Sequence, residues 1–259
     1  MSEKKNSCYG RVLEEIREEK EKILTPEYRY ALDIIAEKMY KERHFIRELI
    51  QNADDAGSKK ILFEIDTKNR VIKVTNWGKP FDVKDVRQIC TMLPSEKKAT
   101  QIGTLGVGFK SVFGISGCPK IFSGGFNFEI RDYVLPEEIE PIDEEEQSDS
   151  TVFIIPIRND IDTESIIDRF DSVSIEMILF LSNINEILVK YDENNHYTIR
   201  KTIVTKRKFW KLKIQYVAIT KEQQKNRTES RFIVFKRKYK IPEAVKDKIR
   251  DALKKEMQG

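Results

Sequence analysis

The periodicity of the apolar residues changes abruptly at Gly57, and this change constrains the fold more than any other feature of the chain. From residue 45 to residue 53 the apolar side chains recur at helical spacing, which indicates a helix with one buried face. The next two apolar runs, ILFEI (61–65) and VIKVTNW (71–77), are rich in β-branched residues and are joined by the polar turn DTKNR. A helix that leads directly into a hairpin is typical of an α+β domain.

The rest of the chain continues this mixture of helices and strands. Helices are expected over residues 11–24, 28–40, 84–93 and 163–181 and from Pro242 onward, with Thr25 and Pro26 separating the first two. Strands are expected at 120–122, 126–135, 151–157 and 184–191, within 198–219 and at 231–241, and the acidic stretch 136–150 is expected to be a surface loop. Because hairpins and helices are interleaved, a mixed or antiparallel sheet is favoured over a doubly wound parallel one.

Composition points to a soluble protein of a reducing compartment. The three cysteines, Cys8, Cys90 and Cys118, are odd in number and lack metal-ligand spacing, so we expect free thiols and a cytoplasmic location. No apolar run is as long as a membrane span, and the first residues do not resemble a signal peptide. We therefore expect no membrane partner.

Charge is distributed unevenly along the chain. Residues 195–259 contain 20 lysines and arginines against 6 aspartates and glutamates, whereas residues 1–194 contain 27 against 37. We therefore divide the chain into a first domain, residues 1–192, and a basic extension of strands and a helix, residues 193–259. Such an extension is typical of a docking surface for nucleic acid or an acidic protein, and it is equally compatible with a solvated face.

The helix before Gly57 carries a line of polar side chains. Glu48, Asn52 and Asp55 are spaced i, i+4, i+7, so they lie within about 60° of one another around the helix axis. On a single amphipathic helix, a solvated face explains such a line. A binding surface becomes the stronger interpretation only together with the glycine-rich stretch that follows.

The stretch GTLGVGFKS (103–111) is rich in glycine and follows a polar segment, residues 91–102, that we expect to act as a lid. Glycines let backbone amides approach an anion, and a helix opened by Phe109 would direct its N-terminus at a phosphate. The stretch is not a Walker phosphate loop, because Phe109 separates Gly108 from Lys110. It is not a Rossmann fingerprint either, because no apolar strand precedes it.

Together these stretches resemble the GHKL ATPases, which include the ninety-kilodalton heat-shock chaperones, gyrase-type topoisomerases, MutL and histidine kinases. The resemblance rests on ELIQNADDAG in a helix, Asn76-x-Gly78 at a strand end, a polar lid, IGTLGVGFKSVF, and a strand beginning at Thr151. The two longer stretches look closest to the sacsin-like branch. The resemblance covers residues 40–192 and implies a Bergerat fold, an α/β sandwich whose mixed, mostly antiparallel sheet is covered by helices.

The resemblance also implies a site for ATP, or its product ADP, and Mg²⁺. Glu48 matches the general base that activates the attacking water, and Asn52 matches the magnesium ligand. Thr151 matches a threonine of the adenine site, and Gly103 to Phe109 match the end of the lid that wraps the phosphates. The positions that match nucleotide-binding residues are Asn52, Asp55, Lys59, Asn76, Gly78, Gly103, Gly106, Val107, Gly108, Phe109, Lys110 and Thr151.

The chain departs from the family pattern in ways that bear on activity. Most members have an aspartate at the position of Asn76, and its carboxylate accepts a hydrogen bond from the adenine amino group. A neutral amide is a weaker acceptor, so weaker binding or altered base choice would follow. Lys79-Pro80 replaces the second glycine of that motif, and no lysine or arginine can be matched to the cation that reaches the γ-phosphate in several branches.

Three functions remain open from the sequence. The first is a slow, Mg²⁺-dependent ATPase that closes a lid or switches a dimer, and the second is a nucleotide-binding interaction module without hydrolysis. The third is an ATP-gated nucleic-acid-binding protein that uses residues 195–259. By analogy with the superfamily, helix 11–24 is available for homodimerisation. A histidine kinase is disfavoured, because neither histidine lies in a recognisable phosphoacceptor helix.

Overall fold

The computed structural model of the chain describes residues 8–41, 44–91, 108–142, 149–191, 195–209, 212–224 and 226–237. The helices are α1 (Cys8–Glu21), α2 (Pro26–Lys41), α3 (His44–Asp55), α4 (Val83–Ile89) and α6 (Thr163–Asp171), with 3-10 turns η2 (Gly108–Gly114) and η3 (Ile175–Leu179). The strands are β1 (Lys60–Asp66), β2 (Val71–Asn76), β3 (Lys120–Ser123), β4 (Phe126–Arg131), β5 (Leu135–Glu138), β6 (Thr151–Pro156), β7 (Glu186–Tyr191), β8 (Asn195–Phe209), β9 (Leu212–Gln223) and β10 (Asn226–Arg237).

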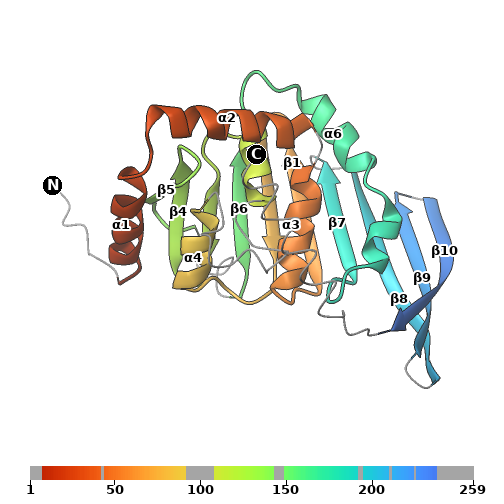
Figure 1. The fold of residues 1–259 in the computed structure, drawn as a ribbon. Helices are drawn as coiled ribbons and strands as arrows, with labels where there is room; N and C mark the ends of the chain where they lie inside the picture. The colour runs from red at the N-terminus through yellow and green to blue at the C-terminus, as the bar shows by residue number, and fades with distance from the viewer. Residues whose placement is uncertain are drawn as a thin grey trace, which may run out of the picture.

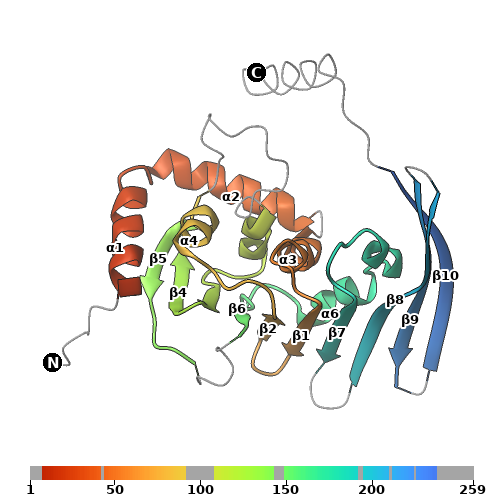
Figure 2. The ribbon, with the colours of Figure 1, turned by 90° about the horizontal axis from the view of Figure 1, so that it is seen from below.

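These strands form one open sheet in the order β10-β9-β8-β7-β1-β2-β6-β3-β4-β5. The pairing of β1 with β7 is parallel, and the other described pairings are antiparallel. The helices lie on one face of this sheet (Figure 1 and Figure 2). The expected mixed α+β fold with a mostly antiparallel sheet is therefore confirmed, and β8, β9 and β10 of the basic extension continue that sheet.

The core lies between the helices and the covered face of the sheet. On α3 the apolar stripe is buried, and on β1 burial alternates so that Ile61, Phe63 and Ile65 point into the core. Phe63 packs edge-to-face against Phe170 of α6, with ring centroids 5.0 Å apart. Burying each such side chain contributes about 1.5–3 kcal/mol, so this stripe fixes the face that α3 turns to the sheet.

Helix α1 covers the edge of the sheet at β5 (Figure 1). Its Leu13 and Ile16 are buried, and Arg17 forms an ion pair with Glu137 of β5 at 3.4 Å. An exposed edge strand is a template for unwanted pairing, and a helix laid against it removes that hazard. Leu13 and Ile16 of α1 are thus used for packing within the chain.

Two predictions of secondary structure were wrong. Residues 126–135 do not form one strand, because Asp132 and Tyr133 have positive φ values of 46° and 68° and turn the chain back into β5. The strand β5 therefore lies within what was expected to be an acidic loop. The expected helix over 163–181 is divided into α6 and η3, and the hydroxyl of Ser172 donates to Arg169 O where α6 ends.

Several local predictions are confirmed. Thr25 Oγ1 accepts a hydrogen bond from Tyr28 N at the start of α2. Gly57, with φ of +81°, ends α3 as expected of a helix C-cap. Cys8, Cys90 and Cys118 are free thiols. The lid beyond Thr91 and the helix expected from Pro242 lie outside the described residues, and the described helices are too short or too polar to cross a membrane.

Candidate active site

The carboxylate of Glu48 lies directly against the backbone of Gly108. A Cβ atom built on Gly108 would fall 1.8 Å from Glu48 Oε2 and 2.4 Å from its Cδ, so no other residue fits there without displacing the carboxylate. Glu48 projects from α3 and Gly108 begins η2, two elements that pack together. The structure thus brings together the candidate general base and the described end of the glycine-rich stretch.

Asn52 lies one helical turn after Glu48 and has an unsatisfied polar atom. Its Nδ2 is buried and has no hydrogen-bond acceptor among the described residues. Buried side-chain nitrogens nearly always have a partner, so an orphan needs an explanation. An acceptor such as a phosphate oxygen or a water molecule would satisfy it.

A second group of candidate site residues meets where the interior strands β2, β6 and β3 begin or end, here called the Asn76–Thr151 edge. Asn76 ends β2 and lies directly opposite Thr151, the first residue of β6. Ser123, which ends β3, is the next residue across the sheet, and its hydroxyl is hydrogen-bonded to that of Thr151 at 2.5 Å. All three side chains are buried. The two residues predicted for the base site are therefore neighbours, and Ser123, which the sequence did not indicate, is hydrogen-bonded to Thr151 beside them.

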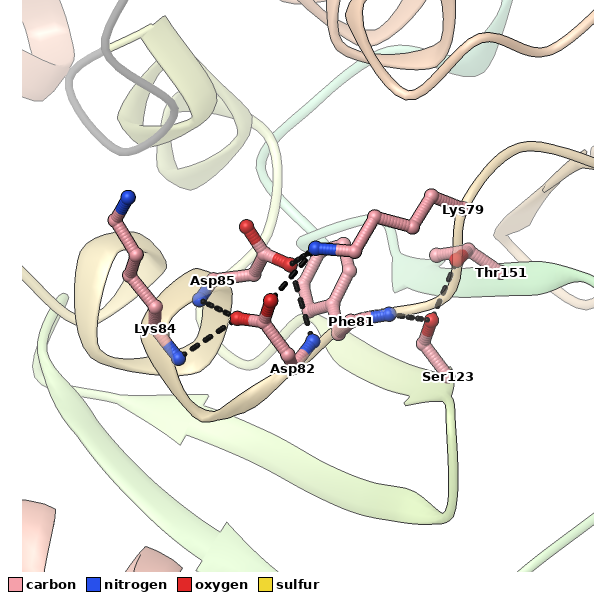
Figure 3. A network of polar contacts seen from close by, with 7 residues as sticks. All are labelled: Lys79, Phe81, Asp82, Lys84, Asp85, Ser123 and Thr151. Carbon is pink, nitrogen blue, oxygen red and sulfur yellow. Dashed lines mark hydrogen bonds and ion pairs between the residues drawn. The ribbon is translucent and has the colours of Figure 1, made fainter.

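The loop after β2 is fixed to this edge (Figure 3). Phe81 N donates to Ser123 Oγ at 2.9 Å, and Lys79 Nζ contacts Asp82 at 2.6 Å and Asp85 at 3.4 Å. Asp82 and Asp85 form a capping box at the start of α4. The hydrogen bond from Lys79 is the main cause that lowers the pKa of Asp82 to about 2. Lys79 therefore helps to hold the loop against α4.

Gly78 lets this loop approach the end of α3. A Cβ on Gly78 would lie 2.7 Å from both Cβ and O of Ala56, and Lys79 N donates to Ala56 O at 2.7 Å. Gly78 N also donates to Asn76 Oδ1 at 3.3 Å. This bond occupies one of the two lone pairs of the Asn76 amide oxygen, so the side chain still offers a ligand one acceptor as well as the donor Nδ2.

Asp55 and Lys59 are placed at the surface with partners of their own. Asp55 is exposed and accepts a hydrogen bond from Gln51 Nε2 at 3.0 Å. Lys59 Nζ donates to Asn183 Oδ1 at 3.3 Å. The polar line of α3 thus divides: Glu48 contacts Gly108 of η2, Asn52 Nδ2 is buried, and Asp55 is exposed to solvent.

The side chains of Phe109 and Lys110 are buried in the core. The Phe109 ring packs 5.6 Å from that of Phe153. Lys110 Nζ donates to the carbonyls of Ile89 and Tyr133, and burial lowers its pKa to about 8. The sequence did not indicate that these two side chains, expected beside the phosphates, are used for packing. Gly103, Gly106 and Val107 lie outside the described residues.

Asp54 is a structural anchor that the sequence analysis missed. Its buried carboxylate accepts hydrogen bonds from the backbone N–H groups of Ser182, Asn183 and Ile184 at 2.8, 2.6 and 2.8 Å. These bonds tie the end of α3 to the segment that leads into β7. One signal was available, since Asp54 lies four residues after the buried Ile50 and therefore on the core side of the helix.

Comparison with known proteins gives a local similarity. Residues 29–138 match the Sacsin domain. The chain is 34% identical over 132 residues to the Protein NO VEIN of Arabidopsis thaliana, covering 46% of this chain and 5% of that protein. It is 31% identical over 100 residues to the Sacsin of Homo sapiens, covering 32% of this chain and 2% of that protein. The chain thus spans a small fraction of either relative, and it is sacsin-like over 29–138, the segment that holds Glu48, Asn52 and Gly108.

Proposed function

We propose that the chain binds ATP with Mg²⁺ between α3, η2 and the Asn76–Thr151 edge, and that it hydrolyses ATP slowly. The observation that carries the proposal is the contact of Glu48 with the Gly108 backbone, one turn from the orphaned Nδ2 of Asn52. The site combines a carboxylate, a glycine backbone in contact with it, and a buried amide nitrogen that has no acceptor among the described residues, and this combination suits a phosphate-containing ligand.

We further propose that the domain has the Bergerat fold and belongs to the GHKL superfamily. The support is the order of the parts in space. The sheet has helices on one face. Around its Asn76–Thr151 edge lie the helix with Glu48 and Asn52, the end of β2 and the start of β6. The local similarity to the Sacsin domain is consistent with this proposal, because it spans the first two of these parts.

The donor set fits Mg²⁺ held together with a nucleotide. The described residues contain no cluster of three or more His, Cys, Asp or Glu side chains that could hold an ion alone, so phosphate oxygens would have to complete its coordination. Mg²⁺ at nucleotide sites typically has few protein ligands, and Asn52 Oδ1 would be one. When bound, the ion would neutralise charge on the phosphates.

Glu48 would act on the attacking water. The water oxygen forms a bond to the γ-phosphorus as the bond from phosphorus to the β,γ-bridging oxygen breaks, ADP leaves, and the water gives up a proton to the Glu48 carboxylate. Backbone N–H groups at the start of η2 would donate to the phosphates. The base would lie against the side chains of Asn76, Thr151 and Ser123, because these three residues are neighbours across the sheet.

Slow turnover is expected because no cation for the γ-phosphate can be assigned among the described residues of this site. Lys110 follows the glycines, but its ammonium is engaged by two backbone carbonyls inside the core. A cation at the γ-phosphate is worth about 10³–10⁵ in rate in related chemistry. The same observation favours a second function, a nucleotide-binding module that switches conformation without measurable hydrolysis.

Phosphate release by the purified chain and by its Glu48→Gln variant separates these two functions. For an ATPase, the variant should bind ATP with similar affinity and release phosphate at a rate indistinguishable from buffer. If neither protein releases phosphate while both bind ATP, the non-hydrolysing module is correct. Phosphate release that is unaffected by Glu48→Gln would contradict the assigned role of Glu48.

A further inference from the structure

The basic side chains of β8, β9 and β10 are sorted by type between the two faces of the sheet. Residues paired across antiparallel strands share a face, and neighbours along a strand alternate. The covered face is marked by buried residues such as Ile199 and Ile219. The lysines on these strands share that face: Lys201, Lys206, Lys208, Lys213, Lys221 and Lys236. The arginines share the opposite face, here called the arginine face: Arg200, Arg207, Arg227, Arg231 and Arg237.

A β-bulge in β8 makes the sorting complete. The register shifts between Ile203 and Thr205, so Thr205 pairs with Tyr216 and Val204 is the extra residue. Without the bulge, strict alternation would place Arg207 on the face of Lys201. With it, Arg207 shares the face of Arg200, and the arginine face extends along the whole of β8.

The arginine face is hollow and partly apolar. A hollow of about 880 Å³ lies over it, lined by residues that include Thr202, Arg207, Tyr216, Arg231 and Ile233. The side chains of Val204, Ile233 and Tyr216 are 65%, 54% and 38% exposed. The helices of the described structure lie on the other side of these strands (Figure 2). Rings and aliphatic groups are thus presented to solvent among guanidinium groups.

Positive charge exceeds negative charge on this face. On β8, β9 and β10 its carboxylates are Glu222 and Glu229, against the five arginines. Glu222 contacts Arg200 at 2.9 Å and Arg227 at 3.6 Å, and Glu229 contacts Arg231 at 2.8 Å. Glu186 of β7 also contacts Arg200, at 2.6 Å. Exposed ion pairs contribute little to stability, so a polyanion can displace them at little cost.

We propose that the arginine face binds single-stranded nucleic acid. A guanidinium group can donate two parallel hydrogen bonds to one phosphate. If only positive charge were needed on this face, lysine would supply it equally well. Exposed bases stack on aromatic side chains, and Tyr216 lines the hollow together with Ile233, its partner on β10. An acidic peptide would engage the arginines but would leave these apolar groups without a partner.

The test is the affinity of the full chain for a fluorescent single-stranded RNA or DNA of about 12 nucleotides, measured by anisotropy at about 50 mM salt without ATP. Arg207→Ala combined with Arg231→Ala should weaken binding at least roughly tenfold. The matched control is Lys206→Ala with Lys236→Ala, which removes the same charge from the same strands on the opposite face. It should weaken binding by less than about threefold.

A second variant separates stacking from charge. Tyr216→Ala should weaken binding roughly tenfold while leaving the salt dependence unchanged, because it removes no phosphate contact. Each variant is checked for an unchanged thermal unfolding midpoint. The proposal is overturned by absence of binding at low salt, or by equal losses in the arginine and lysine pairs. Displacement by polyglutamate as readily as by unlabelled oligonucleotide would assign the face to an acidic protein instead.

Discussion

Glu48 Oε2 lies where a side chain on Gly108 would begin, 1.8 Å from the position of its Cβ. The two residues come from α3 and η2, which are separated in sequence by the hairpin β1–β2 and by α4. This contact joins a carboxylate on a rigid helix to the described end of a glycine-rich stretch. Replacing either residue therefore tests whether the contact belongs to a phosphate site or only to packing.

Gly108→Ala should abolish most of the hydrolysis. The added methyl group must displace the Glu48 carboxylate, and a displacement of about 1 Å in a catalytic group can cost a hundredfold in rate. We expect phosphate release to fall roughly a hundredfold with the fold intact. Gly117→Ala is the matched control, because nothing lies within 4 Å of the position that its Cβ would take. Equal phosphate release from the two variants would contradict the proposed site.

Asn76→Asp should raise the affinity for ATP and lower the affinity for GTP. In the wild-type chain Asn76 Oδ1 accepts from Gly78 N at 3.3 Å and keeps one lone pair, a neutral acceptor, for the base. A carboxylate is a stronger acceptor for the 6-amino group of adenine than an amide oxygen, and it has no donor for the 6-keto group of guanine. The carboxylate variant should bind ATP roughly fivefold more tightly and GTP more weakly. Competition between ATP and GTP measures this, and an unchanged ratio of the two affinities would remove Asn76 from the base site.

Asp54→Ala should destabilise the fold strongly. Its buried carboxylate accepts hydrogen bonds from three backbone N–H groups, and the loss of these bonds should lower the free energy of unfolding by about 3 kcal/mol. Asp55→Ala is the control, because the neighbouring carboxylate is exposed and should change stability by less than about 0.5 kcal/mol. Urea unfolding measures both. Similar losses in the two variants would show that Asp54 is not the anchor.

Lys110 should make stability depend on alkaline pH. Burial lowers its pKa to about 8 from 10.5, so between these values the unfolded chain binds a proton that the folded chain does not. The free energy of unfolding should therefore increase as the pH rises from about 8 toward 10.5. This increase should be lost as the pH falls through about 8.

Comparison with Lys110→Met isolates this contribution. Groups that do not interact with Lys110 are present in both chains and cancel in the difference. The buried Cys90 thiol does interact with Lys110, but its pKa is raised to about 11, so in the folded chain it titrates above the range compared. The stability of the wild-type chain relative to the variant should rise between about pH 7 and pH 9.5. A difference that does not change with pH would show that Lys110 is not desolvated.

The sequence predicted the structure correctly where the local signals for helix ends and strands agreed with the pattern of buried apolar residues. Gly57 ends α3 with a positive φ, and the β1–β2 hairpin follows as the change of periodicity predicted. The pairing of Asn76 with Thr151 could not be read from local pattern, because it depends on β6 joining β2 from 75 residues away. Their meeting was expected only through the family resemblance.

Features set by single backbone irregularities escaped prediction. The positive φ values of Asp132 and Tyr133 create β5, and neither residue type demands such a turn. The bulge at Val204 decides the face of Arg207, although the surrounding sequence reads as continuous strand. Lys110 was misjudged for another reason, since a lysine beside glycines suggests a phosphate contact, whereas its two carbonyl partners come from distant segments.

The central claim is that Glu48, Asn52 and the Gly108 backbone form an ATP site that needs Mg²⁺. Calorimetric titration of the chain with ATP, with Mg²⁺ and then with EDTA in its place, tests this claim most directly, with Asn52→Ala as the paired variant. The account predicts that each chain binds one ATP with higher affinity in Mg²⁺ than in EDTA, and that this difference in affinity is lost in Asn52→Ala. ATP binding that is absent, or that is identical with and without Mg²⁺ in both proteins, would contradict it.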